Sequence, residues 1–279
     1  MANKGKYYES QFEEATIELL REAHWQYTLG DDIHRKYTDP LIEEDLRNFL
    51  AVQYKDKNLT TSEMDGIVAN LRNTGGQNDY YALRNAFLLY RDGYDFAYSD
   101  SRDNPFRMEY IDFEHPDHNI FRCVNQFVMG QGRENRRPDI LLFINGIPVC
   151  IIELKNPTKQ NATIRDAHTQ ICTRYMRDIP ALLKYCALAV ISDGAKNALG
   201  TTYTPFEFFY EWKKIENEDK AGKGLDTLRT LIRGALSPER ILEILRDYVY
   251  FPDPTKEDDT TEIVCRYPQF FATRKLREH

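Results

Sequence analysis

Three charged side chains mark the ends of an otherwise apolar stretch, RPDILLFINGIPVCIIELKN, which runs from residue 137 to residue 156. Asp139 precedes the first apolar run, and Glu153 and Lys155 close the second. Carboxylates are hard oxygen ligands of the kind that Mg²⁺ takes, and the backbone carbonyl of Leu154 offers another oxygen. A bound Mg²⁺ acidifies a water and stabilises charge on a phosphodiester, and a nearby lysine can orient that water. The stretch therefore predicts hydrolysis of phosphodiesters, with Asp139 and Glu153 as metal ligands.

Such a site requires a hairpin that brings the charged ends of the stretch together. Asn145-Gly146 is the strongest short hairpin motif available, so we expect the turn there. Glu153 and Lys155 are two apart on one strand, and their side chains then leave the same face of the sheet. The alternative interpretation of Glu-x-Lys alone is a surface ion pair at the end of a strand.

The position of Asp139 depends on the geometry of the loop. A two-residue turn without a bulge places Asp139 opposite Ile152, on the face away from Glu153. A three-residue loop that includes Ile147, or a β-bulge near Asp139, shifts the pairing by one residue and sets Asp139 beside Glu153. We expect one of these two irregularities.

The order Pro138-Asp139 followed by Glu153-x-Lys155 resembles the core of the PD-(D/E)xK nucleases. Together with RYMRDIPALLKYCALAVISDGAKNALGT, the stretch resembles the N-terminal nuclease region of the R (restriction) subunit of type I restriction-modification enzymes. This similarity is densest from Arg137 to Trp212. It implies that Asp139, Glu153 and Lys155 are catalytic, with the two carboxylates on Mg²⁺ and the lysine on the water.

The family also tends to use an acidic residue of the first helix, where Glu13 and Glu14 compete. Glu13 flanks the apolar face of that helix, whereas Glu14 lies on the solvated side. We choose Glu13 as a catalytic residue; the alternative is that both are solvated helix charges.

A Gln-x-x-x-Tyr pair on the helix after the second strand is another feature of the family. Here Gln170 and Tyr175 are five apart, and on an ideal α-helix they point in directions about 140° apart. Tyr175 also lies in the middle of an apolar stripe, where a core role would explain it. We retain both as candidate catalytic residues.

The segment GQGRENRRPD supplies basic groups just before Asp139. Arg133, Arg136 and Arg137 there are candidates for holding DNA phosphates. The alternative is a solvated loop that balances local acids.

The expected fold class is mixed α/β: a restriction-endonuclease-like core with a mixed central sheet flanked by helices. The first hundred residues have a helical pattern. From about residue 121, short apolar runs predict strands, namely FRCVNQFVMG, DILLFING, IPVCIIELK and CALAVISDG. A helix over residues 161–180 crosses between the last two, and two more helices, GLDTLRTLIRGAL and SPERILEILRDY, follow.

Composition limits the other possible functions. A formal net charge of −7 argues against a general basic coat, although a local basic cluster can still bind nucleic acid. The start has no signal-peptide core and no run suits a membrane span, so we expect a cytoplasmic protein without a membrane partner. The five cysteines predict neither disulfides nor a zinc knuckle. The close pair His115 and His118 has no third ligand nearby in the pattern, which favours a solvated turn.

We expect an endonuclease domain over 1–248, comprising a helical part to about 110, a core over about 111–212 and a helical extension over about 213–248. The resemblance implies that an ATP-dependent motor follows the nuclease, yet no phosphate-binding loop occurs in the chain. Residues 249–279 would therefore be a linker and the start of a truncated motor. The ending CRYPQFFATRKLREH resembles the segment before the motor's phosphate loop. That resemblance implies that Gln269 lies near the base of a nucleotide.

The leading hypothesis is a Mg²⁺-dependent DNA endonuclease domain of a type I restriction R subunit, with ATP used only by the full-length parent enzyme. The resemblance implies double-stranded DNA and the methyltransferase and specificity subunits as partners. The alternatives are a catalytically silent nuclease fold that docks or holds DNA, and a stand-alone repair or mobile-element nuclease.

Overall fold

A six-stranded mixed sheet forms the centre of the protein. The computed structural model describes residues 2–100, 103–130, 135–155, 163–216, 222–252 and 260–277, with side chains from Ser10 onward. The strand order is β1 (Gln26–Leu29), β4 (Phe121–Asn125), β5 (Ile140–Ile144), β6 (Ile147–Leu154), β7 (Leu188–Ser192) and β8 (Asn197–Gly200). The pairs β1–β4 and β6–β7 are parallel, and the other neighbours are antiparallel.

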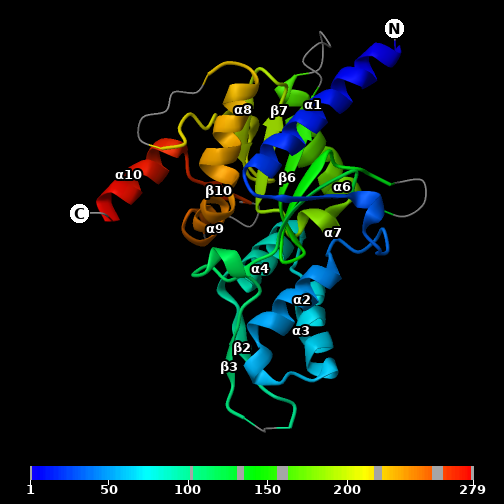
Figure 1. Cartoon of the computed structure of the whole chain (residues 1–279), viewed down its shortest axis with the longest axis vertical. Helices are drawn as coiled ribbons and strands as arrows, with labels where there is room; N and C mark the ends of the chain where they lie inside the picture. The colour runs from blue at the N-terminus through cyan, green and yellow to red at the C-terminus, as the bar shows by residue number, and fades with distance from the viewer. Residues whose placement is uncertain are drawn as a thin grey trace.

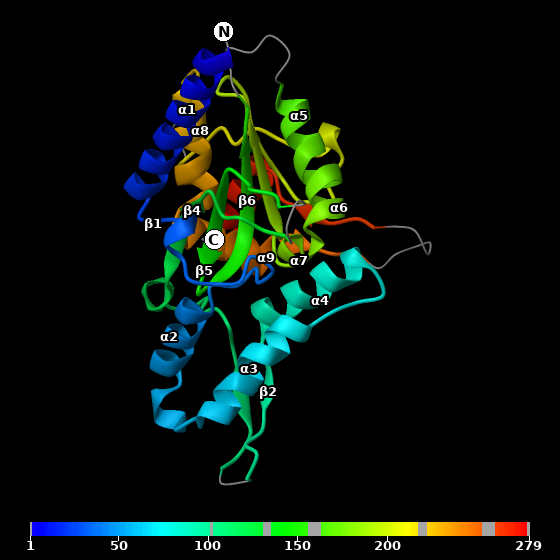
Figure 2. The same cartoon turned by 90° about the vertical axis from the view of Figure 1, so that its right-hand side faces the viewer.

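Two separate apolar cores cover the two faces of this sheet. On one face, α1 (Ala2–Glu22) and α8 (Leu225–Leu231) pack over alternate strand residues such as Leu142, Ile152 and Val190. On the other face, α5 (Ile164–Thr169), the π-helix Gln170–Tyr175 and α6 (Met176–Asp178) cover the intervening residues, such as Leu141 and Ile151. Figure 2 shows the sheet between these two helical layers. Because both faces are buried, the strands are continuously apolar, which explains why the sequence has no alternating polar pattern there.

The part of the chain between β1 and β4 forms a helical lobe below the sheet (Figure 1). It contains α2 (Glu43–Gln53), α3 (Thr61–Asn73), α4 (Asp79–Asp92) and a hairpin of β2 (Tyr94–Phe96) and β3 (Phe106–Met108). The buried apolar side chains of its helices and hairpin belong to the same core as the α1 face of the sheet, whereas Ile42, just before α2, packs in the other core. The expectation of an entirely helical first hundred residues is wrong for β1, which joins the central sheet, and for β2.

The C-terminal part returns along the α1 face of the sheet. α7 (Pro180–Leu183) precedes β7, and the π-helix Ile232–Leu236 leads into α9 (Pro238–Asp247). The short strands β9 (Val249–Tyr250) and β10 (Ile263–Val264) pair with each other before α10 (Tyr267–Arg277). The expected linker falls mostly on residues 253–259, which lie outside the described residues.

The expected fold class is confirmed, because a mixed six-stranded sheet with helices on both faces forms the core. Each predicted strand run contains one observed strand, and a helical segment does cross between β6 and β7. No helix in the described ranges is long and apolar enough to cross a membrane.

Candidate active site

A β-bulge in β6 brings Asp139 beside Glu153. The turn at Asn145-Gly146 is a regular two-residue turn, since Ile144 pairs with Ile147, so the three-residue loop is wrong. Both turn residues have positive φ, 50° and 78°, as a type I′ hairpin turn requires.

The pairing shifts further along the hairpin. Phe143 pairs with Pro148 but Leu142 pairs with Cys150, so Val149 is the extra residue. Ile140 consequently pairs with Ile152, and Asp139 takes the position opposite Glu153. The expected bulge exists, but it lies in the middle of β6 and not near Asp139.

The two carboxylates meet at the end of the hairpin, on the face covered by the π-helix. Asp139 Oδ2 accepts the backbone N–H of Leu154 at 2.7 Å. Glu153 is 1% exposed, whereas Asp139 keeps partial access to solvent. Burial raises the pKa of both carboxyls, and the negative charge of Glu153 raises that of Asp139 further. Without a cation, the pair therefore disfavours the doubly ionised state.

Glu153, Lys155, Gln170 and Tyr175 form a closed ring of hydrogen bonds. Lys155 Nζ donates to Glu153 Oε1 at 2.6 Å and to Gln170 Oε1 at 2.8 Å. Gln170 Nε2 donates to the Tyr175 hydroxyl at 2.6 Å, which in turn donates to Glu153 Oε2 at 3.2 Å. The ring fixes both the glutamate and the ammonium group, so Gln170 and Tyr175 contact the Glu153 and Lys155 side chains.

The π-helix explains how Gln170 and Tyr175 meet despite their spacing. It runs from Gln170 to Tyr175, and its hydrogen bonds link residues five apart instead of four. Residues five apart therefore lie nearly one above the other there. The divergence of about 140° that holds for an ideal α-helix does not apply to this segment. The core role considered for Tyr175 also holds, because its ring is 2% exposed and packs in the core below the helix.

Glu13 reaches the same end of the sheet from the opposite layer. Its carboxylate accepts hydrogen bonds from Asn125 Nδ2 at 2.7 Å and from Gln126 Nε2 at 2.9 Å. It is close enough for its charge to raise the pKa of Asp139. Glu14 is exposed on the other side of the helix. A catalytic role for Glu13 stays a prediction.

The residues that hold Glu13 were not identified from the sequence. Gln126 has a positive φ of 57°, a strained conformation that turns the chain just after β4. Tyr27 donates to Asn125 Oδ1 at 3.0 Å and so orients its amide group. The polar Asn-Gln pair that ends the apolar run FRCV is the one sequence feature that could have pointed to them.

The candidate DNA-binding arginines are placed differently from one another. Arg136 pairs with Asp178 at 2.7 Å and its backbone bonds to Met129, so it connects the loop to α6. Arg137 is exposed. Arg133 lies outside the described residues. Phosphate binding stays a prediction for all three.

Gln269 lies in the first turn of α10, away from the carboxylates. Its side-chain carbonyl accepts the backbone N–H of Arg266 at 2.8 Å, which caps the start of the helix. The side chain is exposed. A role at a nucleotide stays a prediction.

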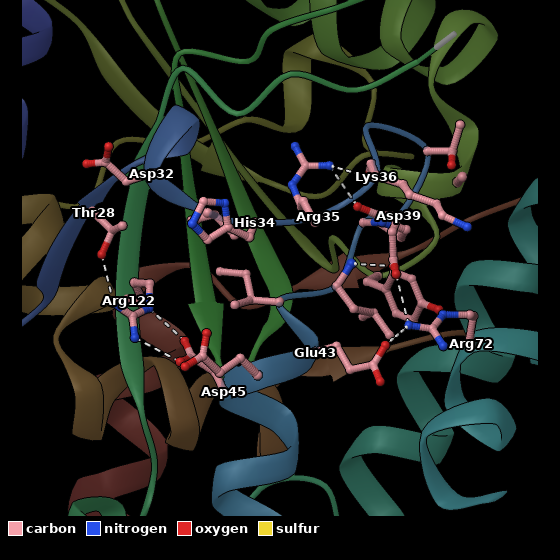
Figure 3. Close-up of a pocket in the computed structure, with 18 of the residues that line it drawn as sticks. Thr28, Asp32, His34, Arg35, Lys36, Asp39, Glu43, Asp45, Arg72 and Arg122 are labelled. Atoms are coloured by element: carbon pink, nitrogen blue, oxygen red, sulfur yellow. Dashed lines mark hydrogen bonds and ion pairs between the residues drawn. The ribbon is translucent and has the colours of Figure 1, made fainter. Parts of the chain in front are cut away.

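A cavity of about 840 Å³ lies between the sheet and the helical lobe and does not include the carboxylates (Figure 3). Two sets of its charged residues form ion pairs. Arg122 makes a bidentate ion pair with Asp45 at 2.7 and 2.8 Å, and Arg72 bridges Asp39 and Glu43. These pairs connect β4 and α3 to α2 and the loop before it, so we assign them a structural role.

The donors at the carboxylate site suit a hard divalent cation. Two buried carboxylates with raised pKa values offer oxygen ligands and little competing positive charge except Lys155. A cation there would relieve the repulsion between Asp139 and Glu153. Chemically, the arrangement can hold a metal ion and a water next to an ammonium group.

Comparison with known proteins places the chain in a family. Residues 6–208 match the family model described as type I restriction enzyme R protein N terminus. The chain is 28% identical to the HindI endonuclease subunit of Haemophilus influenzae, with 96% of this chain and 26% of that protein covered. It is 27% identical to the putative MjaIXP endonuclease subunit of Methanocaldococcus jannaschii, with 94% of this chain and 27% of that protein covered.

A third relative is the putative MjaVIIIP endonuclease subunit of the same archaeon, 30% identical over 62% of this chain and 16% of that protein. The chain thus spans about a quarter of the length of the first two relatives. The match of the family model covers well over half of the chain and includes every residue of the carboxylate site. The chain belongs to the family of type I restriction enzyme R protein N termini.

Proposed function

We propose that this chain is a Mg²⁺-dependent DNA endonuclease module of a type I restriction enzyme, and that Asp139, Glu153 and Lys155 carry the reaction. The observation that supports this most directly is the bulge at Val149. Without that extra residue, Asp139 and Glu153 would lie on opposite faces of the sheet.

The residues divide the work of phosphodiester hydrolysis between them. Asp139 and Glu153 hold the metal ion, which when bound lowers the pKa of a water and offsets charge on the phosphate. Lys155 orients the attacking water, because its ammonium group is fixed between Glu153 and Gln170. Tyr175 keeps the Gln170 amide and the Glu153 carboxylate in place.

Glu13 adds a third carboxylate from α1. Asn125 and Gln126 orient it toward the end of β5, where it supports the same cation. Arg137 is exposed just before Asp139 and is placed to meet a DNA phosphate.

The proposed partners follow from the relatives, which are endonuclease subunits of type I restriction enzymes. We propose that the module acts on double-stranded DNA, together with methyltransferase and specificity subunits, in the cytoplasm. We also propose that residues 1–248 form the nuclease domain and that 249–279 lead toward an ATP-dependent motor, where Gln269 would lie near the nucleotide.

The test compares cleavage with translocation in the restriction enzyme that carries this chain. Asp139→Ala and Lys155→Ala should abolish Mg²⁺-dependent cleavage of unmethylated DNA and leave ATP-driven translocation unchanged. Glu13→Gln should reduce cleavage, and Glu14→Gln is its matched control on the exposed side of the same helix. Cleavage that persists in both the Asp139 and Lys155 variants would contradict the proposal and favour a docking role for the fold.

A further inference from the structure

A second cluster of potential metal ligands lies at the other end of the molecule's central hairpin, in the loop between β3 and β4. The segment DFEHPDH places Asp112, His115 and His118 three residues apart in succession. One ligand atom of each lies within 4.8 Å of the others. The sequence pattern gave no third ligand for the two histidines, and the fold supplies Asp112.

We propose that Asp112, His115 and His118 form a binding site for a divalent transition metal such as Zn²⁺. His115 Nδ1 and His118 Nδ1 both face Asp112 Oδ2, at 3.3 and 2.9 Å. In tetrahedral coordination, bond lengths of about 2.0–2.2 Å separate neighbouring ligand atoms by about 3.4 Å. The first of these distances already fits, and the second needs to open by about half an ångström. The two imidazole nitrogens, which lie within 4.8 Å of each other, need to reach the same spacing.

Asp112 would bind a metal through one oxygen, Oδ2. Its side chain is 5% exposed, and Oδ1 accepts the backbone N–H groups of Glu114 and His115 at 3.0 and 2.9 Å. Gln53 Nε2 donates to Oδ2 at 3.1 Å. Such hydrogen bonds to a ligating carboxylate fix its orientation.

The two imidazole rings are also arranged alike. They stack with centroids 4.8 Å apart and 22° between their planes, and their side chains are 64% and 49% exposed. Without a metal, each ring can donate its Nδ1–H to the shared oxygen; with a metal bound, each neutral ring would carry its proton on Nε2 and present the Nδ1 lone pair to the ion. The exposed side of the cluster leaves room for a water as the fourth ligand.

The choice of metal follows from the donor types. Imidazole nitrogen suits Zn²⁺, Ni²⁺ and Cu²⁺, whereas Mg²⁺ takes oxygen ligands. This site is therefore chemically distinct from the carboxylate site at Asp139 and Glu153. A metal here would join the loop to the end of α2 through Gln53, next to the contact of α9 at Arg246 with the Phe113 carbonyl.

Isothermal titration of the metal-depleted chain with Zn²⁺ tests the proposal. The titration uses an Asp139→Ala background, so that the carboxylate site does not compete. We expect one site per chain, affinity at least about 10-fold weaker in either His118→Gln or His115→Gln, and unchanged affinity in His24→Gln, a control histidine outside the cluster. Substitution with Co²⁺ should give the visible absorption of a four-coordinate ion, which the same two variants lose.

Two outcomes would overturn the proposal: no saturable binding below about 0.1 mM Zn²⁺, or binding that neither histidine substitution weakens. Circular dichroism checks the fold of each variant. His115 is the more exposed of the two, so His115→Gln serves as the second variant if His118→Gln does not fold.

Discussion

The two ends of the β5–β6 hairpin differ in how their buried polar side chains are stabilised. At the turn, Asn145 is fully buried, and its side chain accepts from Ile120 N–H at 2.7 Å and donates to Tyr110 O and Asn119 Oδ1 at 3.0 and 2.8 Å. At the other end, Asp139 and Glu153 share a small volume with one ammonium group. In the first arrangement each polar atom of the Asn145 side chain has a partner in the protein, whereas the second brings two carboxylates together beside one ammonium group.

The pKa values of two buried acids express the same contrast. Burial raises the pKa of Asp139, and the charge of Glu153 adds to that effect. Burial acts in the same direction on Asp112, but hydrogen bonds from His115, His118 and Glu114 leave its pKa below the usual value. The protein's own donors thus favour the ionised form of Asp112, whereas burial and the charge of Glu153 disfavour the ionised form of Asp139. Carboxyls with strongly raised pKa values of the second kind cluster at functional sites.

The largest expected effect comes from Asp139→Asn, which removes one charge and keeps the shape of the side chain. If Asp139 is the metal ligand that we propose, DNA cleavage should fall by at least about 100-fold. The metal-free variant should at the same time unfold at a higher temperature than the wild type, because the repulsion with Glu153 disappears. Cleavage assays and thermal unfolding in EDTA measure the two effects. A variant that loses both activity and stability would contradict the claim that repulsion between Asp139 and Glu153 destabilises this end of the hairpin.

At the turn end, Asn145→Ala should lower the free energy of unfolding by about 2–4 kcal/mol, since three buried partners lose their hydrogen bonds. Asn145→Gly is the matched control, because glycine accepts the positive φ of 50° without strain. The glycine variant should be about 1 kcal/mol less destabilised than the alanine variant. Urea denaturation gives both values, and a neutral Asn145→Ala would mean that the turn is not held by these bonds.

The pH dependence of stability should separate the wild type from Asp139→Asn. The pKa of Asp139 is raised in the folded state above the unfolded value of about 3.9, so the folded protein binds the proton more tightly. Its contribution to stability is therefore complete below about pH 3.9 and is lost as pH rises toward the folded pKa.

Relative to the variant, the metal-free wild type should lose up to about 1.4 kcal/mol per pH unit over that range. Other groups with raised pKa, such as the buried Glu262, occur in both proteins and cancel in the difference. Chemical denaturation between pH 4 and 8 provides the comparison. Parallel curves for the two proteins would show that burial does not disfavour the ionised form of Asp139 in the folded protein.

A smaller effect is expected for Tyr175→Phe. The hydroxyl donates to Glu153 at 3.2 Å and accepts from Gln170 at 2.6 Å, and Lys155 still binds both of these partners. Loss of the bond to the carboxylate is worth about 0.5–1.5 kcal/mol, or roughly a 2- to 13-fold decrease in cleavage rate. Single-turnover cleavage kinetics measure it, with Tyr27→Phe as a comparison at the Asn125 side of the site. A decrease as large as that of Asp139→Asn would mean that the tyrosine touches the reaction directly.

The sequence predicted the sheet well and the geometry of the site only in part. Both faces of the sheet are buried, so its strands appear as apolar runs that are easy to recognise. Both edge strands of that sheet, β1 and β8, were missed, because each is only 4 residues long. The 3-residue β2, which lies among helices, was missed as well. Asp139 and Glu153 could lie on one face of the sheet only if the hairpin contained a bulge or an odd loop. Nothing in the apolar run marked Val149 as the bulged residue.

Contacts between distant segments could not be predicted from spacing. Asn125 and Gln126 meet Glu13 only because β4 lies beside β1 and α1 crosses the end of the sheet. Asp112 joins the two histidines because a tight turn at Pro116 folds the chain back. In both cases the packing of the whole domain decides which polar side chains meet.

The π-helix has a consequence for where the chain can lose a residue without losing the site. A π-helical turn is an α-helix with one inserted residue, and the residues before and after it keep their places. Removal of the exposed Thr173 should therefore convert the segment into a regular α-helix in which Gln170 and Tyr175 become four apart and still touch. We expect this deletion to change cleavage less than about 3-fold, whereas removal of Val149 should abolish it. A change of one residue in length would then be tolerated in the helix and not in the strand, although both segments position partners of the Glu153 carboxylate.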